Sequence, residues 1–183
     1  MKKGKISRMR IGKNCKISDK ISIYGEENIE IGDNVRIDEF SILVGGSGLK
    51  IGSHVHIAAY SILYGTAGLT IGDFTGCAVR TTILSALDDY HGFSLIGPCV
   101  SMKFKPRLLA APVNIGRHVV LGVGCVVLPG VNIGDGASFG AYSLIKKDCL
   151  AWSIYAGLPV KRICDRDRKV LELEKKFLEE YNA

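Results

Sequence analysis

Asp88, Asp89 and His91 lie within one short segment, LDDYHG, residues 87–92. Carboxylates and imidazoles are among the side chains that most often move protons in enzymes, and a histidine held out on a loop is suited to act as a general base. The same residue types also suit a polar turn on the surface. The choice between the two depends on the elements that carry the segment.

A sequence repeat organises the chain on both sides of this segment. An Ile-Gly anchor recurs at intervals of 20 residues and later of 18 residues, at Ile11, Ile31, Ile51, Ile71, Ile115 and Ile133. A finer step of six residues is apolar throughout: Ile11, Ile17, Ile23, Ile31, Ile37, Leu43, Ile51, Ile57, Leu63, Ile71, Cys77, Ile83, Ile115, Leu121, Val127, Ile133, Phe139 and Ile145. Three six-residue units predict one triangular coil of a parallel β-helix. About six coils should stack at intervals of ~4.8 Å.

Each unit also has a second inward position, because the residue four after the anchor is small or apolar in nearly every case, with Glu27 as the exception. The glycine after many anchors is expected to serve the corner by adopting a positive φ. Four of the six cysteines fall on inward positions, and no CxxC pair occurs. Core packing is therefore expected for Cys15, Cys77, Cys125 and Cys149, in preference to metal binding or disulfides.

The repeat is interrupted once. If the fourth coil closed like the first three, the next anchor would fall at residue 91, but it arrives at Ile115, which predicts an insertion over residues 91–114. The insertion contains three prolines and no six-residue pattern. Long irregular loops in compact domains are usually functional. His91 is the first residue of this loop, which favours the catalytic alternative.

The hexad pattern decays after Ile145, and Val170, Leu173, Phe177 and Tyr181 then follow at helical spacing. We expect one β-helix domain over residues 1–163 and an amphipathic helix over residues 164–183. The apolar stripe of this helix should pack against the coil or against a neighbouring subunit.

Positive charge is concentrated at one end of the chain. Residues 1–20 carry a net charge of +7, and the remaining residues carry −1. Such an end predicts a solvated cap, or attraction to a membrane surface or an anionic substrate. No nucleic-acid partner is expected. Because no apolar run reaches the roughly 20 residues of a membrane span and no signal-peptide pattern is present, a cytoplasmic location is expected.

The later repeats, VNIGRHVVLGVGCVVLPGVNIGDGASFGAYSLIKKD followed by YAGLPVKRI, resemble the hexapeptide-repeat acyltransferases. Within that family they are similar to the branch of galactoside, serine and polysaccharide O-acetyltransferases. The resemblance implies an all-β fold, a left-handed parallel β-helix, and a homotrimer with active sites in the clefts between subunits. A face buried between subunits is also supported by apolar residues at outward positions, namely Tyr60, Phe74, Val120 and Leu144.

In this family a loop histidine takes the proton from the acceptor as it attacks the acetyl thioester, and a backbone N–H stabilises the oxyanion. His91 occupies the place of that histidine. A neutral imidazole with a pKa near ~6.5 can accept the proton, and Asp88 or Asp89 could fix its tautomer. Either carboxylate could instead bind the sugar or face water.

The resemblance also implies acetyl-CoA as co-substrate, with no metal. The residues that match the coenzyme-binding positions of the family are Gly122, Val123, Ala141, Lys147, Pro159 and Lys161. By that match, the first three lie beside the pantetheine, the lysines meet the nucleotide phosphates and the proline lies near the adenine. A solvated side chain is the alternative for each lysine.

Acceptor contacts are predicted from location. Tyr60, Arg80 and Asp88 come from the two coils beneath the loop and could bind sugar hydroxyls or a phosphate. In the loop, Lys103, Lys105 and Arg107 could meet a pyrophosphate or form a solvated edge.

Three further histidines fall at outward positions of coils: His54, His56 and His118. A zinc carbonic anhydrase with the same fold uses three histidines from two subunits, but its His-x4-His pair is absent here. We therefore predict surface or interface histidines and no zinc site.

Together these features predict a transferase that moves acetyl from acetyl-CoA to a carbohydrate hydroxyl in surface-polysaccharide assembly, of O-antigen or capsule. N-acetylation of a nucleotide-linked amino sugar is the alternative, and it would depend less on His91. A non-enzymatic β-helix scaffold is the alternative from a different class.

Overall fold

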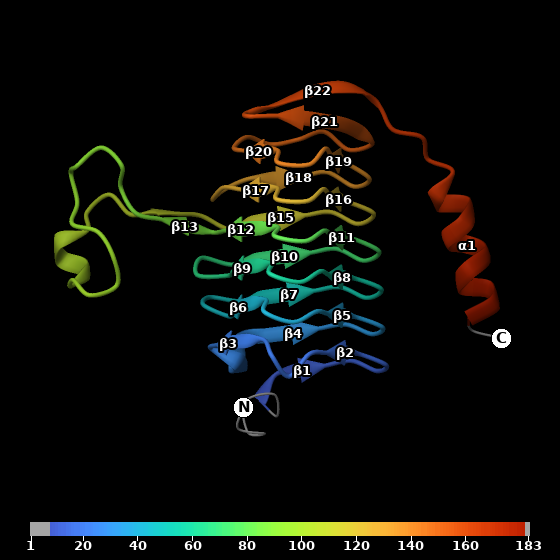
Figure 1. Ribbon diagram of the computed structural model, residues 1–183, viewed down its shortest axis with the longest axis horizontal. Coiled ribbons are helices and arrows are strands. Elements are labelled where there is room, and N and C mark those ends of the chain that lie inside the picture. The colour runs from blue at the N-terminus through green and yellow to red at the C-terminus, as the bar shows by residue number, and fades with distance from the viewer. Residues whose placement is uncertain (1–7, 182–183) are drawn as a thin grey trace.

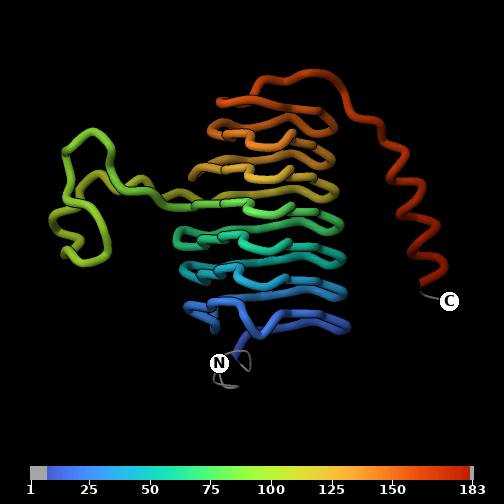
Figure 2. The backbone as a smooth tube through the Cα atoms, in the orientation of Figure 1, coloured from blue at the N-terminus to red at the C-terminus, as the bar shows by residue number. Residues whose placement is uncertain are grey.

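The computed structural model describes residues 8–181 as a stack of triangular coils, with an arm on one side and a helix on the other (Figures 1 and 2). Sheet A is the first face, with strands in the order β1 (Arg10–Ile11), β4 (Ile29–Ile31), β7 (Leu49–Ile51), β10 (Leu69–Ile71), β15 (Val113–Ile115) and β18 (Asn132–Ile133). Sheet B is the second, with β2 (Lys16–Ile17), β5 (Arg36–Ile37), β8 (His56–Ile57), β11 (Gly76–Cys77), β16 (Val120–Leu121), β19 (Ser138–Phe139), β21 (Ser153–Gly157) and β22 (Val160–Asp165). Sheet C is the third, with β3 (Ser22–Tyr24), β6 (Ile42–Val44), β9 (Ile62–Tyr64), β12 (Thr82–Leu84), β17 (Val126–Val127) and β20 (Leu144–Ile145).

The strands pair in parallel and in register from coil to coil. Ile51 pairs with Ile71, and Ile71 pairs with Ile115 across the interruption of the repeat. Equivalent positions of successive repeats therefore lie directly above one another. The predicted left-handed parallel β-helix, with its inserted loop and C-terminal helix, is confirmed.

The interior of the coil is filled by the hexad positions. These residues are buried throughout, except that Ile11 and Ile17 are half-buried at the open end of the stack. A further inward column on sheet A, two residues before the anchors, was not part of the predicted hexads: Ile29, Leu49, Leu69 and Val113. The four cysteines predicted for the core pack in the interior of the coil, with Cys15 half-buried at its lower end.

The glycine after the anchor has a different role from the predicted one. A Cβ on Gly32 would lie 2.8 Å from the carbonyl carbon of Gly52, and a Cβ on Gly72 would lie 2.6 Å from that of Gly116. Neither residue has a positive φ. Successive coils approach too closely at this corner for any side chain, so close approach and not φ requires glycine.

Positive φ is adopted instead by larger residues at two corners. The corner between sheets A and B carries Asn14, Asn34, His54, Phe74, His118 and Trp152, all with φ between 53° and 58°. The corner between sheets B and C carries Phe40, Tyr60, Arg80 and Tyr142, with φ between 57° and 63°. Because the conformation repeats at each level, the side chains stack as columns, and the rings of Phe40 and Tyr60 lie 5.2 Å apart.

Helix α1 (Val170–Tyr181) covers the first of these columns, as predicted for its apolar stripe. Phe177 packs edge-on against His54, and Glu174 accepts a hydrogen bond from Nε2 of His118 at 2.8 Å. The prediction of surface or interface histidines is therefore wrong for His118, which is 3% exposed beneath α1. Phe74 also lies under the helix and not on a face open to another subunit.

The inserted segment forms an arm on a short stalk. Strand β13 (Ala86–Leu87) pairs antiparallel with β14 (Leu109–Ala110), and the 3-10 helix η3 (Met102–Phe104) lies between them. The arm therefore begins and ends earlier than the predicted residues 91–114, because the stalk pairing starts at Ala86 and Val113 has already rejoined the coil in β15. Figure 1 shows it extending from the end of β12, on the opposite side of the stack from α1.

The upper end of the stack closes differently from the lower one. β21 adds in parallel to β19, and β22 then returns antiparallel along β21. The segment predicted as the end of the domain is thus a hairpin that extends to Asp165, and α1 begins at Val170. A second 3-10 helix, η2 (Glu26–Asn28), lies near the lower end. Residues 1–7, which hold part of the basic end, lie outside the described residues.

Candidate active site

A hollow of about 340 Å³ lies on the outer surface of sheet B. It is lined by His56, Ala58, Gly76, Cys77, Ala78, Val79, Val120, Leu121 and Val123. The hollow exists because Gly76 occupies the outward position of β11, where the two lowest coils carry Lys16 and Arg36, and because the small residues Ala58 and Ala78 follow β8 and β11. A Cβ built on Gly76 meets no atom within 4 Å, so the space in front of this residue is open.

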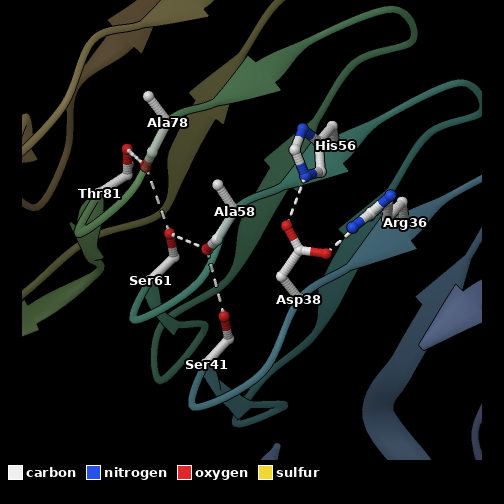
Figure 3. Close-up of polar contacts among 8 residues, drawn as sticks. All are labelled: Arg36, Asp38, Ser41, His56, Ala58, Ser61, Ala78 and Thr81. Carbon is white, nitrogen blue, oxygen red and sulfur yellow. Dashed lines mark hydrogen bonds and ion pairs between the residues drawn. The ribbon is translucent and has the colours of Figure 1, made fainter. Parts of the chain in front are cut away.

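The floor of the hollow is held from inside by buried hydroxyl groups. Ser61 donates to the carbonyl of Ala58 at 2.7 Å, and Thr81 donates to the carbonyl of Ala78 at 2.7 Å. Figure 3 shows these contacts one above the other, with Ser41 below them. Each turn next to the hollow is therefore tied to its own coil, which fixes the backbone that lines the site.

Of the predicted coenzyme-binding backbone, Val123 lines the hollow, and Gly122 and Ala141 lie next to it. A side chain at Gly122 is excluded, because a Cβ there would lie 2.9 Å from the amide nitrogen of Ala141. The amide of Tyr142 donates to the carbonyl of Val123 at 2.7 Å. Within residues 8–181, no hydrogen bond uses the amide N–H of Val123 or of Ala141. Gly122, Val123 and Ala141 thus form one edge with two free donors.

The other predicted coenzyme residues lie farther up the stack. Lys147 is exposed after β20, Lys161 is exposed on β22, and Pro159 is exposed in the turn between β21 and β22. No hydrogen bond or ion pair within the described chain engages either lysine side chain, so both remain available to an anionic ligand.

Two of the predicted acceptor residues stand in the column at the corner between sheets B and C. Tyr60 is 53% exposed and Arg80 is also exposed, and both lie beside the lining residues Ala58, Ala78 and Val79. Lys20 lies over the ring of Phe40, 5.9 Å from its centroid, in the same column. The column presents aromatic faces and positive charge next to the hollow, a combination that suits a nucleotide or a phosphorylated sugar.

A polar cluster that the sequence reasoning did not assemble lies at the lower edge of the hollow. Asp38 accepts a hydrogen bond from Nε2 of His56 at 2.8 Å and another from Nε of Arg36 at 2.7 Å (Figure 3). Burial acts to raise the pKa of Asp38, but the hydrogen bonds and positive charge of Arg36 and His56 outweigh it and hold this pKa below its usual value. Arg36 and Asp38 are adjacent outward positions of one coil, and the 20-residue register places His56 above Arg36.

The two aspartates beside His91 have structural partners inside the arm. Asp89 accepts hydrogen bonds from the backbone N–H groups of His91, at 2.9 Å, and of Phe93, at 2.6 Å. These hydrogen bonds lower the pKa of Asp89. Asp88 pairs with Lys105 at 2.6 Å and accepts the N–H of Gly97, and the Lys105 contact is the main cause of its lowered pKa. Within the described chain, neither carboxylate forms a hydrogen bond or ion pair with the imidazole of His91.

The arm holds His91 away from the coil that carries the hollow. His91 is exposed, and no hydrogen bond or ion pair of residues 8–181 links its side chain to Tyr60, Arg80 or the rim at Val123. The arm also exposes several large apolar side chains: Tyr90, Phe93, Leu95, Ile96, Met102, Phe104 and Leu109. Figure 2 shows the arm extending sideways from the stack of coils.

The buried thiols are not nucleophiles. Burial raises the pKa of Cys77 to about 12 and that of Cys149 to about 11, so both remain protonated at neutral pH. Within residues 8–181, no group of three or more His, Cys, Asp or Glu side chains is arranged to hold a metal ion. No helix in the same range is long and apolar enough to cross a membrane.

Comparison with known proteins identifies the family. Residues 112–147 match the bacterial transferase hexapeptide repeat (six repeats). The chain is 42% identical to dTDP-4-amino-4,6-dideoxy-D-glucose acyltransferase of Escherichia coli over an alignment of 168 residues. This alignment covers 91% of this chain and 87% of that protein. It is 37% identical to galactoside O-acetyltransferase of Escherichia coli K12, but over only 65 residues, which cover 34% of this chain and 32% of that protein.

Among solved structures, the chain is similar to AntD, an N-acyltransferase from Bacillus cereus. A variant of AntD in complex with dTDP-4-amino-4,6-dideoxyglucose and coenzyme A is 43% identical and superposes with a TM-score of 0.90, over 93% of this chain and 91% of that chain. AntD has also been solved with dTDP and 3-hydroxybutyryl-CoA, with 42% identity, a TM-score of 0.89, and coverage of 94% of this chain and 90% of that chain. The chain described here belongs to the bacterial transferase hexapeptide family, whose relatives include acetyltransferases and acyltransferases.

Proposed function

We propose that this protein transfers an acyl group from acyl-CoA to the amino group of a nucleotide-linked amino sugar. The observation that carries the proposal is the extent of the similarity, because the amino-sugar acyltransferases match over nearly the whole chain. The match to a galactoside O-acetyltransferase covers about a third of the chain. The expected transfer to a polysaccharide hydroxyl is therefore replaced by the alternative, transfer to nitrogen.

The shape of the site supports this acceptor. The small residues Ala58, Gly76 and Ala78 leave room for a sugar ring next to the backbone edge at Val123. Beside them, Tyr60 and Arg80 offer an aromatic face and a guanidinium group for the nucleotide part. The amide N–H groups of Val123 and Ala141 are suited to the amide carbonyls of a pantetheine chain, and Lys147 and Lys161 to its distant phosphates.

The proposal includes a homotrimer in which the arm of one copy reaches the hollow of the next. The exposed apolar residues of the arm need a partner surface. The outer face of sheet C is a second candidate contact, because most of its outward residues are aliphatic side chains that are only half-buried: Ile42, Val44, Ile62, Leu84, Val126 and Leu144. In this arrangement His91 contacts the acceptor on the neighbouring copy, with Asp89 fixing the turn that carries it. A cytoplasmic location remains part of the proposal.

The test is release of free CoA from acetyl-CoA and from 3-hydroxybutyryl-CoA with matched acceptors. The acceptors are dTDP-4-amino-4,6-dideoxyglucose, the corresponding dTDP-sugar with a hydroxyl in place of the amine, and a simple galactoside. We expect release with the amino sugar alone, and a product whose mass rises by one acyl group. Sedimentation of the same sample should give a trimer.

Different outcomes separate the alternatives. Equal release with the hydroxyl sugar would contradict the N-acyl assignment, and release with the galactoside alone would restore O-acetylation. No release with any acceptor would favour a scaffold. The two acyl-CoA arms determine the acyl preference. A chimeric trimer of His91→Ala subunits and Gly76→Val subunits tests the arm, because it should regain activity only if the arm and the hollow act between copies.

A further inference from the structure

The hollow on sheet B contains a histidine that is positioned like a catalytic base. His56 lines the hollow, its side chain is 51% exposed, and its Nε2 atom is 2.8 Å from Oδ2 of Asp38. A carboxylate on Nε2 fixes the tautomer in which Nε2 carries the hydrogen, which leaves the lone pair of Nδ1 free. Nothing in the fold requires this arrangement, because the outward residues of sheet B do not contribute to the core.

The surroundings of His56 keep Asp38 in its charged form. Asp38 also accepts a hydrogen bond from Arg36, at 2.7 Å, and its side chain is only 18% exposed. Arg36 pairs with His56 in register from the coil below, and Gly76 pairs with it from the coil above. Arg36 and Asp38 are therefore the charged groups that face the imidazole along the sheet, while Gly76 offers only space.

The same hollow joins His56 to the edge proposed for the coenzyme. Val123 and His56 both line it, and the small residues Ala58, Gly76 and Ala78 lie between them. An acyl-CoA whose pantetheine follows the Val123 edge carries its thioester into this space. An amino group that enters from the Tyr60 column meets the thioester beside His56.

Resting on the proposed function, we propose that His56 is the group that takes the proton from the acceptor nitrogen, and that Asp38, held by Arg36, is its positioning residue. The free amine attacks the thioester carbonyl carbon, the new C–N bond forms, and the carbonyl electrons move to oxygen. Nδ1 of His56 takes a proton from the nitrogen of this tetrahedral intermediate. The carbonyl then re-forms, the C–S bond breaks with its electron pair on sulfur, and the imidazolium returns the proton to the thiolate.

The first experiment compares His56→Asn and Asp38→Asn with the wild-type protein in the acyl-transfer assay, from pH 5 to pH 9. We expect kcat/KM of His56→Asn to fall by ~100-fold or more, with the acid limb of the pH profile lost. Asp38→Asn should reduce kcat more than it raises KM, because it disturbs the base and not the binding of either substrate. His91→Ala, run in parallel, should retain the acid limb, because in this mechanism the limb belongs to His56.

A second variant tests the hollow without touching the histidine. Gly76 has an ordinary strand φ and open space in front of its Cα, so Gly76→Val should fold and fill the hollow beside His56. We expect transfer to fall by ~100-fold, since a small displacement of the reacting groups has effects of this size. Thr70→Val is the matched control, because Thr70 is exposed on sheet A of the same coil and lies away from the hollow.

The outcomes separate the two proposals. If the wild-type protein acylates the amino sugar and His56→Asn keeps both its rate and its acid limb, the role of His56 is wrong and the proposed function stands. If the acid limb disappears in His91→Ala instead, the base is on the arm. If Gly76→Val is as active as Thr70→Val, the hollow is not the reaction site. A wild-type protein that fails to acylate the amino sugar contradicts the proposed function itself.

Discussion

The coil and the arm of this protein are held together by different interactions. In the coil, large side chains such as Leu63 are completely buried, and the strand that carries Leu63 pairs in register with neighbours above and below. In the arm, the stalk pairs only two residues on each side, and Phe93 and Leu95 are more than half exposed. The arm is held mainly by charge and by backbone hydrogen bonds, of which the contacts of Asp88 and Asp89 are the centre. The packing of the coil therefore supplies most of the free energy of folding, whereas the arm serves to position the residues that it carries.

The largest effect is expected in the core of the coil. Leu63→Ala removes a fully buried side chain from the inner column of sheet C. The free energy of unfolding should fall by about 2–5 kcal/mol, because the stacked coils above and below cannot collapse into the cavity. Chemical denaturation followed by circular dichroism measures the loss. Leu150→Ala, at a 68% exposed position, is the control and should stay within about 0.5 kcal/mol. Equal losses would contradict a coil-centred stability.

An arm substitution should show the reverse pattern. Lys105→Ala removes the ion pair with Asp88 and the hydrogen bond to the carbonyl of Gly97. We expect acyl transfer to fall by ~10- to 100-fold, because the arm no longer holds its residues in one geometry. The unfolding midpoint should move by less than about 2 °C, since no core contact is lost. Lys50→Ala, on the exposed face of sheet A, should change neither quantity. A large drop in the midpoint would mean that the arm supports the coil.

The contact between α1 and the coil should give an intermediate effect on stability. Glu174 is 10% exposed and bonds His118 and Arg117. Glu174→Gln should destabilise the docked helix by about 1–3 kcal/mol, because the partly buried Arg117 and the buried His118 lose their charged acceptor. Hydrogen exchange of the α1 amides measures the change. Glu179→Gln, exposed on the same helix, is the matched control, and equal exchange in the two variants would show that the contact does not hold the helix.

The smallest expected effect is the response of the arm to acid. The pKa values of Asp88 and Asp89 are lowered by Lys105 and by backbone N–H groups, respectively. Groups with lowered folded-state pKa values contribute stability above the unfolded pKa of ~3.9, and this contribution is lost as the pH falls through the folded values. Pepsin should therefore cut within residues 88–108 as the pH falls from about 4 to 2, before it cuts the coil. Simultaneous cutting of coil and arm would show that the arm has no separate acid transition.

Much of the coil could be predicted from the sequence, because a solenoid is periodic and each anchor reports the same environment. The spacing of Ile51, Ile71 and Ile115 gave the stacking and located the interruption. The role of the glycines could not be predicted in this way, since the close approach at Gly72 involves a coil 44 residues further along the chain. The antiparallel stalk of the arm was also not predicted, because its two strands are only two residues long and show no periodic pattern of apolar residues.

The roles of the candidate site residues stay predictions, but some of their positions can be compared with the structure. Val123 lines the hollow, Ala141 lies next to the adjacent Gly122, and Tyr60 and Arg80 follow the lining residues Ala58 and Val79. The cluster of Arg36, Asp38 and His56 was missed, although the 20-residue register predicts which outward residues become neighbours. Applying that register to polar outward positions, and not only to apolar inward ones, would have found it. In the proposed trimer, the place where His91 acts depends on a second copy of the chain, which no pattern within one sequence defines.

The antiparallel return of β22 limits the length of the structure. A stack of parallel strands in register could in principle recruit further strands at either end and grow as a fibre. At the upper end, β22 reverses direction and presents an exposed edge with Lys161, Arg162 and Asp165. At the lower end, Arg10 and Lys16 stand exposed on the first strands of sheets A and B. Charged edges of this kind oppose end-to-end addition of further chains. The parallel pairing that builds the coil therefore does not continue from one molecule to the next.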